Sequence, residues 1–175
     1  VVIRLYADER FEVGGVVALA PEEIRYLRTV RRGSHEAQLF NRAGQVAEVT
    51  IEGNLARIEQ VKQNPWPLHP LRVAVGLPEP SVVKQLIASL SELGVTDLSF
   101  FKADRSQSSL SRLPSEDKQD RLAVEAARQC ERPVPLKITT VAFESLLDAS
   151  SASTTVVLDE HPDAGSFPVG SEVNL

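Results

Sequence analysis

A proline-rich segment divides this sequence into two parts with different hydrophobic periods. Residues 64–70 read Asn-Pro-Trp-Pro-Leu-His-Pro, and three prolines in so short a stretch exclude a helix and disfavour a central strand. Before this segment, apolar and polar residues alternate in short runs, whereas after it strand-like runs alternate with helix-like ones. The sequence therefore predicts two units, residues 1–64 and residues 70–175, joined by a linker.

The first unit is predicted to be a small β-barrel that contains one helix. Five short runs have the alternation of strands: Ile3–Tyr6, Val16–Leu19, Glu36–Phe40, Gln45–Ile51 and Leu55–Val61. Residues 41–44 and 52–54 between them are types that tolerate the positive φ of tight turns. The helix is predicted to begin at Pro21, which suits a first helical position, and to end before Gly33.

The second unit is predicted to begin with a βαβ arrangement. Leu71–Gly76 and Asp97–Phe101 read as buried strands. The run Ser81–Leu93 between them is amphipathic and has the length that a crossover between parallel strands needs. Ser81 is the predicted cap of this helix, and Gly94 is its predicted end.

Further elements extend the same alternation. A helix is predicted over Ser115–Glu131, with Cys130 on its apolar stripe, and strands are predicted at Thr154–Leu158 and from Glu172. The second unit is therefore predicted to be α/β with a largely parallel sheet.

Composition and charge exclude several classes of protein. The longest apolar runs are too short to span a membrane and the first residues lack the pattern of a secretory signal, so a cytoplasmic protein is predicted. One cysteine allows no internal disulfide and no thiol-rich metal site, so no metal is predicted. The net charge is −5, but residues 141–175 hold six acids and no Lys or Arg, which leaves +1 on the rest of the chain. The overall acidity is therefore compatible with a nucleic-acid surface elsewhere.

The predicted helix of the first unit carries a cluster of arginines, namely Arg25, Arg28, Arg31 and Arg32. Three of them recur at helical spacing, so their guanidinium groups can share one face and contact neighbouring phosphates, while Tyr26 can stack on a base. The alternative is an ordinary solvated helix face, which many helices have.

A second polar cluster lies in the α/β unit. Arg105 follows a sheet strand, where ligand sites of open α/β sheets gather. Glu125, Gln129 and Arg132 have the spacing of one helical face. Taken alone, these residues equally fit the polar side of a helix whose other side packs on the sheet.

The residues of this second cluster belong to a series of short motifs that follow one another in a fixed order. These motifs are Glu92-Leu93-Gly94-Val95, then Asp104-Arg105-Ser106, then Glu-Ala-Ala-x-Gln-x-x-Arg-x-x-Pro over residues 125–135. Further motifs are Arg4-Leu5-Tyr6, residues 26–32, Leu39-Phe40-Asn41 and residues 158–162. In order and spacing the chain resembles the ribosomal small-subunit RNA uridine-N3 methyltransferases known as RsmE, which belong to the SPOUT superfamily.

The resemblance implies a PUA-like RNA-binding β-barrel followed by a SPOUT parallel α/β domain that forms a trefoil knot. It implies a homodimer that acts on ribosomal RNA of the small subunit with S-adenosyl-L-methionine as the methyl donor. Arg105 and Arg132 are then candidates for the substrate base or its phosphate, with Glu125 and Gln129 orienting them. The implied cofactor residues are Leu158, Glu160, His161, Pro162 and Leu175. A plain turn at the end of a strand remains the alternative for residues 158–162.

Two departures from the family pattern stand out. The family's cofactor loop, Ile-Gly-Pro-Glu-Gly-Gly, is expected just past Leu175, so the knot is predicted to be incomplete here and residues 1–175 alone are predicted not to bind the cofactor. In addition, Cys130-Glu131 stands where the family commonly has Ser-Gly. Two other functions stay open: an RNA-binding module without catalysis, and a two-domain α/β enzyme acting on a small metabolite.

Overall fold

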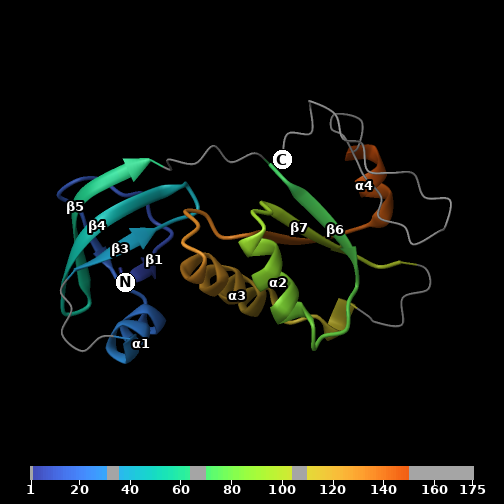
Figure 1. The fold of residues 1–175 in the computed structure, drawn as a ribbon, viewed down its shortest axis with the longest axis horizontal. Coiled ribbons are helices and arrows are strands. Elements are labelled where there is room, and N and C mark those ends of the chain that lie inside the picture. The colour runs from blue at the N-terminus through green and yellow to red at the C-terminus, as the bar shows by residue number, and fades with distance from the viewer. Residues whose placement is uncertain (1, 31–35, 64–69, 104–109, 150–175) are drawn as a thin grey trace.

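The computed structural model describes residues 2–30, 36–63, 70–103 and 110–149, and Figure 1 shows them as two units side by side. The first unit contains β1 (Arg4–Tyr6), β2 (Val16–Ala18), α1 (Pro21–Val30), β3 (Glu36–Phe40), β4 (Gln45–Glu52) and β5 (Leu55–Gln63). The second contains β6 (Arg72–Gly76), α2 (Val83–Glu92), β7 (Asp97–Phe101), the short 3₁₀ helix η1 (Leu110–Arg112), α3 (Glu116–Gln129), β8 (Lys137–Val141) and α4 (Phe143–Ala149). None of the described helices is long and apolar enough to cross a membrane.

The first unit is a curled five-stranded sheet that forms a half-barrel (Figure 1). Its strand order is β1-β3-β4-β5-β2; β1 pairs with β3 in parallel, and the other neighbours are antiparallel. Alternate residues of the strands point inward, as the burial of Ala47, Val49 and Ile51 on β4 illustrates. All five strands expected from the alternation are present, and Pro21 begins the helix as expected.

The second unit is a three-stranded parallel sheet in the order β6-β7-β8. Crossovers between parallel strands are right-handed, so two successive crossovers in one direction place α2 and α3 on the same face of the sheet. The two helices accordingly pack against each other in front of the strands (Figure 1). Ile87 of α2, Leu98 and Phe100 of β7 and Ala123 of α3 are buried in the core between these layers.

Some expectations for the second unit need correction. The helix α2 begins at Val83, so its N-cap residue is Val82, whose side chain makes no capping hydrogen bond. The prediction that Ser81 caps this helix is therefore wrong. The helix does end at Gly94, whose φ of +86° suits glycine.

The third strand is β8, a segment that the sequence analysis missed. Its residues, Lys-Ile-Thr-Thr-Val, are less apolar than the run Thr154–Leu158, which was expected to be the third strand. The expected strands at Thr154–Leu158 and from Glu172 lie outside the described residues.

Candidate functional site

The two units meet at an interface built from β1, β3 and α3. Phe40, Val124 and Ala127 form a small buried cluster, and Tyr6 and Val46 pack against it. The rings of Tyr6 and Phe40 meet edge to face, with centroids 5.5 Å apart. The arrangement of the units therefore depends on a hydrophobic core of its own, separate from those of the half-barrel and the parallel sheet.

Arg4 links β1 to the C-terminal end of α3. Its Nη1 donates to the carbonyl oxygen of Ala127 at 3.2 Å, and its Nη2 donates to that of Arg132 at 3.0 Å. The guanidinium also lies 4.7 Å from the centroid of the Phe40 ring. Burial lowers the pKa of Arg4, but a cation that binds the last carbonyls of a helix is favoured by the helix dipole.

The backbone at this helix end has an unusual conformation. Cys130 donates its N–H to the carbonyl of Ala126, and Arg132 donates to the carbonyl of Ala127, with Glu131 between them at a φ of +56°. This is the pattern in which a left-handed residue closes a helix, and glycine is the usual residue there. The backbone conformation at position 131 is therefore one that favours glycine over the glutamate found in this chain.

Arg128 forms the second connection between the units. Its Nη2 lies 2.5 Å from Oε1 of Glu23 on α1, and both side chains are largely buried, at 12% and 7% exposure. Its guanidinium also stacks 4.1 Å from the centroid of the Tyr26 ring, so that one face of this ring is covered. Burial raises the pKa of Glu23, whereas the positive charge of Arg128 acts in the opposite direction. A hydrogen bond also acts to lower this pKa, because the backbone N–H of Tyr6 donates to Glu23 Oε2 at 3.1 Å.

Arg132 holds α2 and β7 against the end of α3. Its Nη1 donates to the carbonyl oxygens of Ser91 at 3.0 Å and Val95 at 2.7 Å, and burial lowers its pKa. Ser91 lies in the last turn of α2 and Val95 just precedes β7, so this guanidinium lies at the amino-terminal edge of the sheet. Glu125 and Gln129, by contrast, are exposed on α3.

The carboxyl edge of the sheet is at the opposite end of the second unit (Figure 1). Phe101 at the end of β7 packs against Phe143 of α4, with ring centroids 5.2 Å apart. Arg105 follows this strand but lies outside the described residues. A five-residue strand such as β7 is roughly 16 Å long, so within one chain Arg132 is separated from that edge by at least the length of β7.

The arginines of α1 are arranged differently. Arg25 and Arg28 are exposed, and within the described part of the chain neither makes an ion pair. Because successive helical residues are rotated by about 100°, Arg28 lies nearly opposite Tyr26, on the side away from α3. Arg31 and Arg32 lie outside the described residues.

The cofactor residues implied by the sequence are not among the described ones. Leu158, Glu160, His161, Pro162 and Leu175 all fall beyond residue 149. In the ranges that the structure describes, no group of three or more His, Cys, Asp or Glu side chains could hold a metal ion. Sequence analysis missed the roles of Arg4, Glu23 and Arg128. Arg4 belongs to a motif of the family pattern, whereas Arg128 stands at a variable position of one.

Comparison with known proteins places this arrangement in context. A family model described as an RNA methyltransferase domain matches residues 64–168. A search among curated proteins gave no match. Solved structures with the same fold include a predicted RNA methyltransferase from Thermotoga maritima, with a TM-score of 0.68 and 24% identity over 80% of this chain and 65% of that one.

Two further structures were solved with S-adenosylmethionine bound. One is the ribosomal RNA small subunit methyltransferase E of Neisseria gonorrhoeae, with a TM-score of 0.69, 18% identity and coverage of 86% of this chain and 66% of that one. The other is a putative methyltransferase from Legionella pneumophila, with a TM-score of 0.70, 19% identity and coverage of 94% and 72%. The chain thus spans just under two thirds of the Thermotoga and Neisseria proteins.

Proposed function

This chain belongs to the RNA methyltransferase domain family, and from that premise we propose that it methylates ribosomal RNA with S-adenosyl-L-methionine as the methyl donor. The observation that carries the proposal is the family match over residues 64–168, which includes the whole parallel sheet. The resemblance of its motifs to RsmE supports a finer assignment, N3 of a uridine in small-subunit RNA. We place this activity in the cytoplasm.

We further propose a division of labour between the two units, with residues 1–64 as the RNA-binding domain and residues 70–175 as the methyltransferase domain. The exposed Arg25 and Arg28 of α1 are free to contact phosphates, together with Arg31 and Arg32 that follow. The methyl donor would be held by residues near 158–162 and by Leu175, which lie outside the described residues.

The chemistry sets requirements that the protein's own groups can meet. S-adenosyl-L-methionine supplies an activated methyl group, so the protein mainly has to position the base in line with it. The N3 atom of neutral uracil carries a proton, and a nearby guanidinium favours its loss by stabilising charge on the flanking oxygens. Arg105 is our candidate for this role, because its loop begins at the carboxyl end of β7. Since N3 lies on the pairing edge, the uridine must be unpaired or flipped out.

We propose that the active form is a homodimer. In one chain, the Arg132 guanidinium lies at the amino-terminal edge of the sheet, whereas Arg105 follows β7 in sequence, at the carboxyl edge. A second copy allows the RNA held by one chain to reach residues of the other. Light scattering of the purified protein tests this step, and a monomer at the concentrations used for activity would contradict it.

The methyl-transfer assay uses the full-length natural protein, because residues 1–175 alone are predicted not to bind the cofactor. The assay also contains small-subunit ribosomal RNA and a tritiated methyl donor. We expect tritium to enter the RNA and to be recovered, after nuclease digestion and mass spectrometry, as 3-methyluridine. If the label is recovered in another nucleoside, the RNA methyltransferase activity stands but the assignment to N3 of uridine is rejected. If the protein binds RNA but transfers no methyl group, an RNA-binding module is favoured. If it transfers no methyl group to RNA and its RNA affinity does not depend on salt, an enzyme acting on a small metabolite is favoured.

A further inference from the structure

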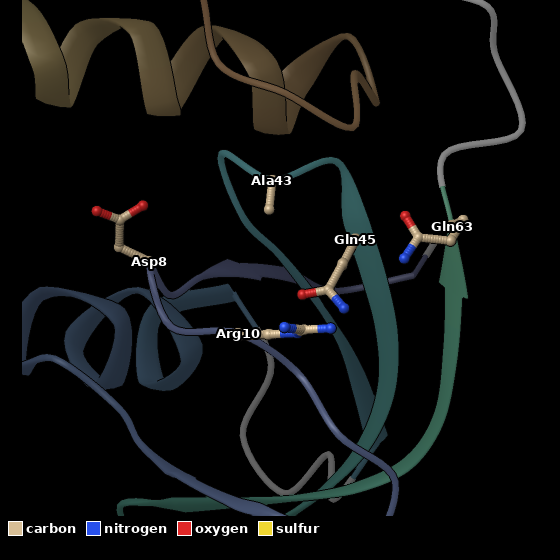
Figure 2. Close-up of a pocket in the computed structure, with 5 residues that line it drawn as sticks. All are labelled: Asp8, Arg10, Ala43, Gln45 and Gln63. Atoms are coloured by element: carbon tan, nitrogen blue, oxygen red, sulfur yellow. The ribbon is translucent and has the colours of Figure 1, made fainter.

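A hollow of about 350 Å³ lies on the half-barrel, beside the end of the last strand before the linker (Figure 2). Its lining comes from three separate segments: Asp8 and Arg10 after β1, Ala43 and Gln45 at the β3–β4 turn, and Gln63 at the end of β5. Figure 2 shows the side chains of Arg10, Gln45 and Gln63 around it. Its volume is at the small end of the range of about 300–1,000 Å³ found for ligand pockets.

A buried hydrogen-bond network fixes the walls of this hollow. The Gln45 side chain accepts the N–H of Phe11 at 2.9 Å and donates to the Phe11 carbonyl at 3.1 Å. The Asn41 amide donates to the carbonyl of Glu9 at 2.8 Å and to Gln45 Oε1 at 3.0 Å. Asn41 and Gln45 are only 1% and 6% exposed, and a satisfied buried network of this kind makes the backbone rigid.

Arg10 lies between the two residues that this network holds, Glu9 and Phe11. Its own side chain is exposed, and within the described part of the chain it makes no hydrogen bond or ion pair, although Asp8, Glu9 and Glu12 are close in sequence. Gln63 is likewise exposed with both amide functions unused by described residues. The protein thus holds the backbone of Arg10 firmly while leaving its guanidinium available.

Asp8 is oriented by its neighbour Tyr6. The Tyr6 hydroxyl donates to Oδ1 of Asp8 at 2.9 Å, which leaves Oδ2 as an acceptor. Figure 2 shows the Asp8 carboxylate turned away from Arg10, Gln45 and Gln63, so Asp8 adds a negative charge at the rim of the hollow. Arg10 supplies a positively charged donor, and Gln63 supplies an amide that can donate and accept. The two charges cancel, so the site suits a neutral group with mixed donors and acceptors better than a phosphate.

We propose that this hollow binds one unpaired nucleobase of the RNA, with Arg10 donating to a base carbonyl and the amide oxygen of Gln63 accepting a base N–H. Uracil and guanine both present such a carbonyl beside an N–H, and a guanidinium plane can also stack on a base. This inference rests on the proposed function, since it takes RNA as the ligand. It adds a site that reads a base, on the same unit as the α1 arginines, for which we propose phosphate contacts.

The test measures binding of a short single-stranded oligoribonucleotide by fluorescence anisotropy, with the full chain and with Arg10→Ala. The matched control is Arg57→Ala, because Arg57 is also an exposed arginine of the half-barrel and has only a 3.9 Å contact with Glu52. A second probe has the same backbone with abasic sites. We expect Arg10→Ala to weaken binding of the first probe about tenfold and to leave binding of the abasic probe unchanged. Arg57→Ala should leave the difference between the two probes as in the wild type.

The possible results separate this inference from the proposal on which it rests. If Arg10→Ala weakens both probes equally, Arg10 contacts phosphate and the base site is overturned. If Arg10→Ala binds both probes like the wild-type protein, the base site is also overturned while RNA binding stands. If the wild-type protein binds neither probe nor ribosomal RNA, RNA binding itself fails. Gln63→Leu should change which homopolymer of U, G, A or C binds best, whereas an unchanged order would remove Gln63 from the site.

Discussion

The outward face of α1 and the interface between the two units are both rich in arginine, but the protein uses these arginines in different ways. At the interface, Arg4 and Arg128 bind carbonyl oxygens or a carboxylate that are wholly or partly buried, and the neighbouring Arg132 binds carbonyls within the second unit. On the outward face, Arg25 and Arg28 are exposed and make no ion pair with described residues. Arginine in a motif is therefore not by itself a sign of nucleic-acid binding.

The difference has a physical basis in the cost of removing charge from water. A guanidinium in a buried interface must be paired and hydrogen-bonded, because an isolated buried charge is strongly unfavourable. An exposed guanidinium costs nothing to leave unpaired and keeps its charge for a ligand. Stability measurements should therefore separate the two groups of arginines, because only the interface variants should unfold more easily.

The largest effect is expected for Arg128→Ala. The change leaves the carboxylate of Glu23 buried without its partner, and breaking a buried pair in this way should lower the free energy of unfolding by about 3 kcal/mol. Urea unfolding measures this loss. The double variant Glu23→Gln/Arg128→Met removes both charges and should lose less than Arg128→Ala alone. Surface substitutions usually change the free energy of unfolding by less than about 0.5 kcal/mol. If Arg128→Ala changes it by no more than that, the pair is not buried in solution.

A smaller loss is expected for Arg4→Met. This variant keeps an apolar stem beside Phe40 but removes the donors for the carbonyls of Ala127 and Arg132. Leaving these groups without a partner should cost about 2 kcal/mol in the free energy of unfolding. Arg4→Lys keeps the positive charge but has fewer donors, so its free energy of unfolding should lie between those of Arg4→Met and the wild type. Equal stability of Arg4→Met and wild type would exclude the capping role.

Glu131 should respond in the opposite direction. Its φ of +56° is unfavourable for a residue with a Cβ, so Glu131→Gly should be more stable than Glu131→Ala by about 1 kcal/mol. Both variants lose the carboxylate near Arg4, so the difference in stability between them reports only the effect of the backbone conformation. Thermal unfolding of both variants gives the difference. If alanine is as stable as glycine at this position, the helix does not end in the left-handed conformation.

The smallest effect on stability is expected for the double variant Arg25→Ala/Arg28→Ala. Both side chains are exposed, so the free energy of unfolding should change by less than about 0.5 kcal/mol. RNA affinity should nevertheless fall, and the slope of log K against log salt should become shallower by about two. An unchanged slope would show that this face of α1 is only solvated.

The two units differ in how far their fold could be predicted from sequence. In the half-barrel, burial alternates with period two and glycine marks the turns, so all five strands were located correctly. In the parallel sheet, β8 has two threonines, of which Thr139 bonds to Ser99 on the neighbouring strand at 3.1 Å. Such a strand is stabilised by its neighbour rather than by its own apolar pattern, and sequence alone does not reveal the neighbour.

The candidate site was less predictable than the fold. Helical spacing predicted that Glu125, Gln129 and Arg132 share one helical face, but α3 ends at Gln129 and Arg132 lies beyond it. The Arg132 guanidinium instead faces the carbonyls of Ser91 and Val95. The departure at Cys130-Glu131 was visible in the sequence, whereas its consequence, a non-glycine residue at positive φ, became visible only with the backbone. Whether Arg105 acts in catalysis stays a prediction.

The bond from Arg4 to the carbonyl of Arg132 also matters for the order in which the newly made chain can fold. The two residues are 128 positions apart. At about 5–20 residues per second, a ribosome needs roughly 6–26 s to add that many residues. During this interval β1, an edge strand that pairs in parallel with β3, has no α3 to contact. We therefore expect the nascent half-barrel to keep an open edge and an unpaired guanidinium until α3 leaves the exit tunnel, and this interval is when it is most exposed to aggregation.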